Sequence, residues 1–356
     1  MLSGHVTAFY LFDIADAIDL KQVGELIDAS TTTRLSTRPP SPIYLQYQQP
    51  PVVIEASAIG AGEVEGFRAR FKAFEYGVVS VALSRALPDT WEELLDAGLR
   101  WHDNAALASG AERLCRELLS RVEPAVARPR SAFLSEDYLV FALLTDASTE
   151  PTEALIASHG PSIAQLLRGE REPLSAQERE EVLRHRISYY TTDMVIATWS
   201  SALVYDTPQG ASGVLELLEF ANSQLLEFRY YDQLLDSELA RIYARLQSDN
   251  WRRTLIPRRY ARAARQVHSL FIDVNELTDK TENALKIAGD VYAARVFGLT
   301  AARLGLDQWK ANVREKLETV DDIYRFAIER TSMARGEFLE LVVVLLILFE
   351  IVLLMH

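Results

Sequence analysis

The sequence predicts an α+β fold in which an N-terminal mixed sheet with helices is followed by long helices alone. Runs of β-branched and aromatic residues alternate with helical patterns up to about residue 205, one segment has the pattern of a hairpin, and no strand pattern follows Pro208. With 356 residues, 49% of them hydrophobic, the chain is long enough for two or three domains with cores of their own.

The first elements are a strand, a helix and a loop. Residues 5–12 are rich in β-branched and aromatic side chains and predict a strand. Residues 16–28 carry apolar side chains at helical spacing and predict a helix. The Ser, Thr and Pro content of residues 29–42 is typical of an exposed loop.

The following segments extend the sheet. Residues 43–47 and 52–56 are strand candidates, and residues 67–87 predict a hairpin that turns at Glu75-Tyr76-Gly77. Helical patterns then occupy about 90–124.

Three further patterns complete the predicted head domain, residues 1–208. They are a strand near 137–144, short helices to about 183 and another strand near 193–205. The mixture of hairpins and helices favours an α+β arrangement.

Two long heptad repeats dominate the second predicted domain, residues 209–336. Nine of ten seam positions in the first repeat and ten of twelve in the second are apolar, which is a coiled-coil pattern. An antiparallel hairpin within one chain is the economical interpretation, and a homo-oligomer joined through these helices is the alternative. The seam positions are Val214, Ala221, Phe228, Leu235, Ile242, Leu218, Leu225, Asp232, Leu239 and Leu246, then Leu306, Val313, Val320, Ala327, Ala334, Leu341, Lys310, Leu317, Tyr324, Thr331, Phe338 and Leu345.

The third predicted segment, residues 337–356, is a hydrophobic helix. Its apolar run, interrupted only by Glu350, spans roughly 22 Å, short of the roughly 30 Å hydrocarbon core of a bilayer. Its many apolar side chains nevertheless outweigh one carboxylate on the insertion scale, so we expect a membrane anchor. The alternative is the buried central helix of a soluble assembly. The residues expected to insert or assemble are Leu341, Val344, Leu345, Leu348, Phe349, Glu350 and Leu353.

No motif for catalysis or for a cofactor is visible. The chain lacks a Walker phosphate loop, the HExxH spacing of a zinc site and the GxSxG elbow of hydrolases. Its one cysteine, Cys115, excludes an internal disulfide and multi-cysteine metal sites. We therefore expect no catalytic, cofactor-binding or metal-binding residue, and a protein that is not an enzyme.

An arginine cluster lies between residues 241 and 265. Eight arginines and one acidic residue give this segment about +7 in a chain whose net charge is −13. Trp251 and Tyr260 lie among the arginines, a combination that suits RNA or lipid headgroups. The alternative is an arginine-rich helix tip paired with acidic neighbours. The candidate contact residues are Arg252, Arg253, Arg258, Arg259 and Arg262.

A second candidate cluster surrounds a predicted strand. It consists of Arg184, His185, Asp193 and Asp206, with Trp199 between the two aspartates in the sequence. A metal or acid–base site is one interpretation. A buried ion-pair network that bridges the two domains is the other.

Several segments resemble the YagE-like family, which includes eukaryotic proteins named as required for meiotic nuclear division. The segments are FEYGVV at 74–79, LRHRI at 183–187, ALVYD at 202–206, LELLE at 215–219 and EFLELVVVLLILFE at 337–350. The resemblance covers most of the chain from about residue 70. It implies a membrane-anchored, oligomer-forming protein without assigned catalytic activity, whose mitochondrial relatives support translation at the inner membrane. The acidic, small-residue-rich composition looks bacterial, and no transit peptide is evident.

These observations together predict a non-enzymatic, membrane-anchored oligomeric scaffold with its head on the cytoplasmic side of the inner membrane. The first alternative is a binding module associated with RNA or the ribosome through the arginine cluster. The second is a cryptic enzyme that uses the region of His185, Asp193 and Asp206. A soluble cytoplasmic oligomer is the alternative for location, and any small-molecule ligand is unknown.

Overall fold

The computed structural model describes most of the head and part of the long helices. The described residues are 2–27, 32–34, 49–59, 62–146, 150–247, 272, 274, 291–323 and 325.

A mixed sheet organises the head, and among the described residues it has nine strands. Neighbouring strands pair antiparallel except β8 and β11, which pair parallel. In spatial order the strands are β3 (Thr32–Arg34), β4 (Val52–Glu55), β5 (Arg68–Ala73), β6 (Val78–Ala86), β1 (Gly4–Asp13), β8 (Leu134–Leu144), β11 (Ser201–Asp206), β10 (Met194–Ala197) and β9 (Arg186–Ile187). A separate two-stranded sheet pairs β2 (Ala17–Ile18) with β7 (Val126–Ala127).

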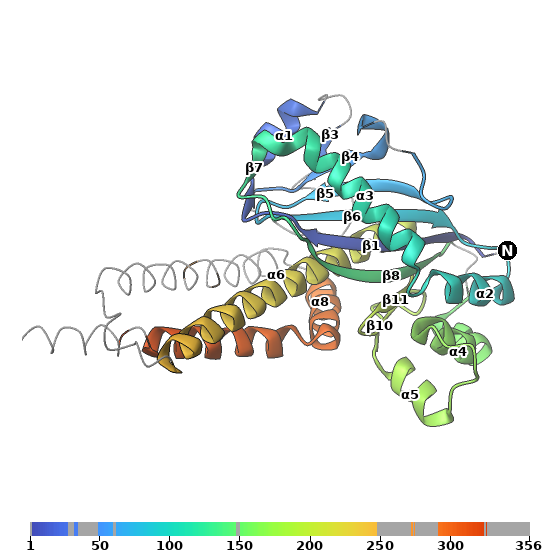
Figure 1. The fold of residues 1–356 in the computed structure, drawn as a ribbon. Helices are drawn as coiled ribbons and strands as arrows, with labels where there is room; N and C mark the ends of the chain where they lie inside the picture. The colour runs from blue at the N-terminus through green and yellow to red at the C-terminus, as the bar shows by residue number, and fades with distance from the viewer. Residues whose placement is uncertain are drawn as a thin grey trace, which may run out of the picture. The chain divides into compact units, whose positions relative to one another are not determined.

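Strand β1 lies in the middle of the sheet, between β6 and β8. Eight consecutive residues of β1, from Val6 to Asp13, are buried, because helices cover both faces of the sheet. In Figure 1, α3 crosses in front of the sheet and α6 runs behind it. Val6, Ala8 and Tyr10 belong to the main apolar core on the α3 side.

Four of the five α-helices of the head begin at residues whose side chains cap them. Asp19, Thr90, Asn104 and Ser175 each accept hydrogen bonds from the first turn of the helix that follows, whereas α4 follows Pro151 and has no side-chain cap. The five helices are α1 (Leu20–Leu26), α2 (Trp91–Trp101), α3 (Ala105–Val122), α4 (Thr152–Arg168) and α5 (Ala176–Arg184), with short 3-10 turns at Ala56–Ile59 and Glu123–Ala125.

Helix α6 (Pro208–Gln247) packs its first half on the other face of the sheet. Residues 214–228 are buried almost without interruption, and the buried set includes the polar side chains of Glu219, Asn222 and Glu227. Lys72 of β5 pairs with Glu219, and both side chains are only 2% exposed. The first heptads of α6 therefore pack against the sheet and the rest of the head, and not only against another long helix as in a coiled coil.

The chain divides into two compact units. One comprises residues 1–230 and 279–308, and the other comprises 231–278 and 309–356. The domain boundary predicted at residue 208 coincides with the start of α6. The division into domains 1–208, 209–336 and 337–356 stays a prediction. Helix α8 (Val291–Leu304) belongs to the first unit.

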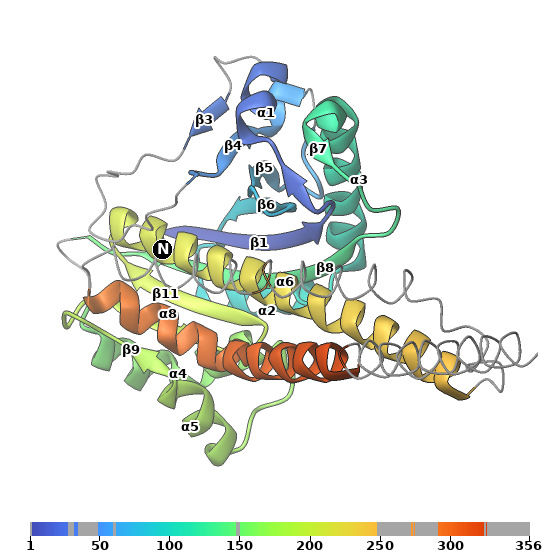
Figure 2. The ribbon, with the colours of Figure 1, turned by 90° about the vertical axis from the view of Figure 1, so that its left-hand side faces the viewer.

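Within the second unit, the last part of α6 lies beside a helical segment, residues 309–323. Leu235 and Ile242 of α6 are buried, as are Val313 and Val320 at the predicted seam of the later helix. The two segments run in the same direction (Figures 1 and 2), so the predicted antiparallel pairing of these two repeats is wrong. These four seam residues are buried within one chain. A homo-oligomer joined through these helices stays a prediction.

The prediction of a mixed N-terminal sheet with helices, followed by helices, is confirmed. One predicted strand, 193–205, is in fact two, β10 and β11, joined by a tight turn at 198–200. The predicted helix at 16–28 is reduced to α1 because β2 takes its first residues. The strand candidate at 43–47 lies outside the described residues.

The expected membrane anchor is not supported. No helix in the described part of the chain is both long and apolar enough to cross a bilayer. The residues named for the anchor, from Leu341 to Leu353, lie outside the described residues, as does the predicted hydrophobic terminal helix. Membrane anchoring is withdrawn as a prediction.

Candidate functional site

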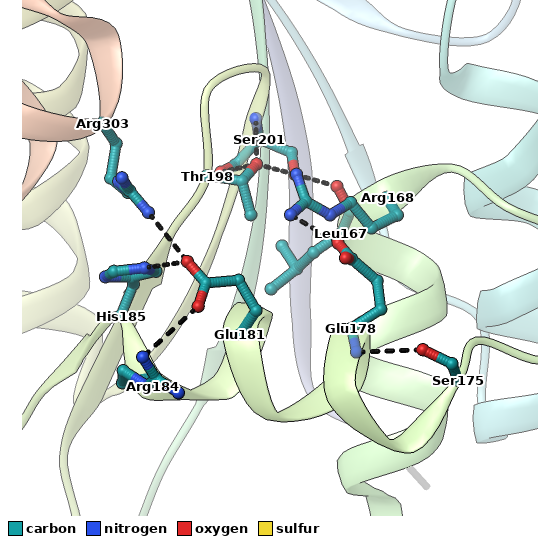
Figure 3. A network of polar contacts seen from close by, with 10 residues as sticks. All are labelled: Leu167, Arg168, Ser175, Glu178, Glu181, Arg184, His185, Thr198, Ser201 and Arg303. Carbon is teal, nitrogen blue, oxygen red and sulfur yellow. Dashed lines mark hydrogen bonds and ion pairs between the residues drawn. The ribbon is translucent and has the colours of Figure 1, made fainter.

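The predicted polar set around His185 divides into two groups. In the first, Glu181 of α5 collects three basic side chains (Figure 3): His185 Nε2 lies 2.8 Å away, Arg184 Nη1 3.5 Å and Arg303 Nη1 of α8 3.9 Å. The hydrogen bond to His185 and the neighbouring positive charges lower the pKa of Glu181. Because Arg184 and Glu181 are well exposed, this group is a surface ion-pair cluster.

The second group holds the two aspartates. The Asp193 carboxylate accepts hydrogen bonds from the backbone N–H groups of Tyr189 and Tyr190 at 2.7 and 2.8 Å. Asp206 accepts one from Thr207 N at 2.6 Å. Both aspartates therefore shape the chain at the ends of strands.

The two aspartates also influence each other and a neighbouring tyrosine. Burial, with the charge of Asp193 as a further cause, raises the pKa of Asp206. Burial and the charges of both aspartates raise the pKa of Tyr292. Within the described residues no hydrogen bond or ion pair joins His185 to Asp193 or Asp206. The acid–base set considered from the sequence stays a prediction.

The arginine cluster begins at the C-terminal end of α6. The candidate contact residues Arg252, Arg253, Arg258, Arg259 and Arg262 lie outside the described residues. Arg241 is described; its Nη1 lies 3.0 Å from Glu238 Oε2, and its side chain is 57% exposed. Lys316 pairs with both Asp232 and Asp236, at 2.7 and 2.6 Å.

A cavity of about 160 Å³ lies where α2 and α4 end near the sheet. Strands β1 and β8 supply Tyr10 and Asp137, and the residues after α2 supply His102 and Asp103. Trp199 joins them from the β10–β11 turn. The sequence did not reveal this cavity, because its residues come from five separate parts of the chain.

Two tight contacts bring the helix ends together beside the cavity. Gly169, the left-handed cap of α4 at φ 67°, packs against the His102 ring, where an added Cβ would lie 2.9 Å from Cγ. His102 Nε2 donates to the Leu166 carbonyl at 2.7 Å, and burial lowers the pKa of His102. Because a carbonyl can only accept, the proton of this hydrogen bond lies on Nε2 of His102.

Hydrogen bonds hold the turn that carries Trp199. The Tyr138 hydroxyl donates to the carbonyls of Thr198 and Ser201, at 3.0 and 2.8 Å. Ser201 Oγ donates to the Leu167 carbonyl of α4 at 2.7 Å (Figure 3). The turn is thereby fixed on both sides, yet Trp199 is 69% exposed.

One feature of the sequence could have indicated the region of the cavity. The helical pattern at 90–124 is broken at His102-Asp103-Asn104, where Asn104 caps α3 and Asp103 adopts a positive φ of 47°. A non-glycine residue in this conformation is uncommon and is often found at functional sites. No group of metal-ligating side chains occurs among the residues that the structure describes.

Comparison with known proteins identifies relatives. The family described as "Uncharacterized protein MJ0711, N-terminal domain" matches residues 3–212. Uncharacterized protein MJ0711 of Methanocaldococcus jannaschii is 26% identical over 201 residues, which are 56% of this chain and 61% of the relative. The chain thus spans about three fifths of the length of the curated relative that it matches. No solved structure matches.

The family match corrects the resemblance to the YagE-like family, and the archaeal relative does not support a bacterial origin. The residues that carried the resemblance have local roles. Gly77 has a φ of 93° in the hairpin turn, and Arg184 and His185 pair with a glutamate one turn earlier. Many unrelated folds place the same residues at such positions, because turns and helix ends require them.

Proposed function

Since the chain belongs to the family of the MJ0711 N-terminal domain, whose description names no reaction, we propose that it is a binding module without catalytic activity. It holds single-stranded RNA through the arginine cluster at 241–265. Phosphate contacts from arginine supply most of the affinity in such complexes.

The uneven distribution of basic and acidic side chains along the chain is the main support for this proposal. With the eight arginines of the cluster and Asp249 set aside, 29 basic and 49 acidic side chains remain of the 37 and 50 in the whole chain. A polyanion is repelled by the rest of the protein and attracted by this one segment. The contact is therefore local.

Two acidic residues shortly before the cluster already have a partner outside it, because Asp232 and Asp236 both bind Lys316. They are therefore less available to neutralise the arginines that follow. At the start of the cluster, Arg241 pairs with Glu238.

The aromatic residues in the cluster suit single strands. Trp251 and Tyr260 lie among the arginines, and base stacking on such side chains contributes about 1–3 kcal/mol per base. A protein that binds only the phosphates of duplexes has no need of them.

Binding of a fluorescent single-stranded RNA to the full chain, measured by anisotropy at several salt concentrations, tests the proposal. We expect affinity to fall with salt and to be lost when Arg252, Arg253, Arg258 and Arg259 are all changed to Glu. For single strands the slope of log K against log salt is about −0.7 per phosphate contact, so the loss of four contacts reduces the slope by about 3.

A matched variant changes four exposed head arginines to Glu: Arg68, Arg70, Arg113 and Arg171. It alters net charge by the same amount and is expected to keep most of the affinity. Equal losses in both variants, or binding insensitive to both, would overturn the proposal.

A further inference from the structure

The cavity between the ends of α2 and α4 has features that RNA binding through the arginine cluster does not use. Its volume of about 160 Å³ is close to that of an engineered cavity of about 150 Å³ that takes up benzene. It therefore has room for a ligand of about six non-hydrogen atoms.

The polar lining of the cavity holds more acidic than basic side chains, with Asp103, Asp137 and Glu170 against Arg168. Among the described residues, neither Asp103 nor Asp137 has an ion-pair partner, and the one arginine in the lining, Arg168, binds Glu178 at 2.6 Å. Burial and the charge of Asp103 raise the pKa of Asp137. Two carboxylates near each other without a counter-ion attract a cation.

Tyr10 adds a further acceptor. Its residue is only 7% exposed and lines the cavity, and its hydroxyl has no hydrogen-bond partner within the described part of the chain. A hydroxyl oxygen in this position can accept a hydrogen bond from a ligand in the cavity.

Aromatic side chains form the apolar part of the lining. Trp101 is held by ring contacts with Phe67 and Phe141. Trp199 stands exposed on the turn whose backbone is fixed by Tyr138 and Ser201, so a large apolar side chain lies at the cavity instead of being buried. An ammonium group and its alkyl chain are both attracted to such rings.

We propose that this cavity binds a small primary amine in its protonated form. A primary ammonium has three N–H donors, and the cavity offers three acceptors, the carboxylates of Asp103 and Asp137 and the Tyr10 hydroxyl. The alkyl part of the ligand lies against Trp101 and Trp199. This site is separate from the arginine cluster and has the opposite charge.

Titration of the full chain with n-pentylammonium, followed by calorimetry and tryptophan fluorescence, tests the proposal. We expect a Kd of about 1 mM or below and binding of 1-pentanol, which has the same number of non-hydrogen atoms, at least tenfold weaker. Asp137→Asn and Tyr10→Phe are each expected to weaken pentylammonium binding about fivefold or more. Asp96→Asn, at an exposed carboxylate of α2, is expected to leave it unchanged.

Further measurements distinguish loss of amine binding from loss of folding and from loss of RNA binding. Circular dichroism and the unfolding midpoint show whether a variant is folded, and Tyr10→Phe keeps the ring in place. The quadruple arginine variant is expected to bind the amine normally, so the two proposals can fail independently. Nα-acetyl-lysine amide binding more tightly than pentylammonium would identify a lysine side chain as the natural source of the ammonium. Equal affinity for pentanol, or saturable binding absent up to about 50 mM, would overturn the proposal.

Discussion

Asp13, at the end of β1, is a carboxylate buried completely inside the head. Its Oδ1 lies 2.7 Å from Arg130 Nε, and the Arg130 guanidinium stacks over the Tyr230 ring at 3.7 Å from the centroid. Burial raises the pKa of Asp13 to about 6, although Arg130 opposes the shift. Burial and the charge of Asp13 also raise the pKa of Glu227 on α6.

The raised pKa of Asp13 predicts a pH-dependent stability. Because the folded chain binds this proton more tightly than the unfolded chain, the stabilisation is complete below about pH 4 and is lost as pH rises to about 6. The loss amounts to at most about 3 kcal/mol. Asp13→Asn should flatten this part of the curve in urea unfolding measured from pH 4 to 7, whereas Asp96→Asn should not. An unchanged slope in Asp13→Asn would contradict the assignment.

Gly77 shows how one residue decides a turn. It joins β5 to β6 with a φ of 93°, and a Cβ built there would lie 1.9 Å from the Ala15 carbonyl oxygen. Both the conformation and the lack of space exclude a side chain.

We expect Gly77→Ala to lower the free energy of unfolding by about 2 kcal/mol or more, because it combines backbone strain with a clash against main chain. Gly62→Ala is the matched control, since nothing lies within 4 Å of its added Cβ. Chemical denaturation of the two variants compares them directly. Similar stabilities for both would show that the turn can rearrange cheaply.

At the scale of elements, a buried ion pair fastens α6 to the sheet. Lys72 of β5 and Glu219 of α6 are both almost fully buried, and Tyr76, beyond the end of β5, hydrogen-bonds to Ser223 one turn further along α6 at 2.7 Å. Charged and polar groups thus sit inside this buried interface. Such pairs fix the register of packed elements more than they add stability.

Lys72→Met should cost about 3 kcal/mol or more, because it leaves the Glu219 charge buried without its partner. The double variant Lys72→Met/Glu219→Leu should recover much of that loss, since apolar residues of similar size replace both charges. Arg100→Met, at an exposed pair with Asp96, should change stability by less than about 0.5 kcal/mol. A double variant that loses the sum of both single losses would argue against this account of the pair.

At the scale of the whole molecule, the two proposed binding regions have opposite charges. The arginine cluster is strongly positive, whereas the cavity of the head presents Asp103 and Asp137. Salt weakens contacts of exposed charges at both, with a Debye length of about 8 Å at physiological ionic strength. We expect affinity to fall more steeply with salt for RNA than for the amine, because an RNA releases several counterions on binding and a small amine at most one or two.

The sequence predicted elements where the pattern is local. The strand at 5–12 and the hairpin around Gly77 were found because alternation and turn residues act between neighbours. The second turn, at 198–200, was missed because β10 and β11 are both buried on both faces and show no alternation. The direction of the heptad segments also escaped, since the same seam can close in parallel or antiparallel pairs.

The candidate site could be predicted from the sequence less well than the strands and helices. Arg184, His185, Asp193 and Asp206 are close in the chain, but each one serves a helix end, a turn or a surface ion pair. The predicted membrane anchor and family rested on composition and short segments, which do not distinguish one fold from another.

The sequence by itself determined most of the strands and helices of the head, the concentration of arginine at 241–265 and the lack of a familiar catalytic motif, because each depends on residues near one another in the chain. Only the tertiary structure decided that Tyr10, Asp103 and Asp137 share one cavity, and that Trp199 stands exposed beside them. The physical reason is that sheet order and helix packing, which bring distant residues together, result from burial of apolar surface over the whole head, and no short segment specifies them.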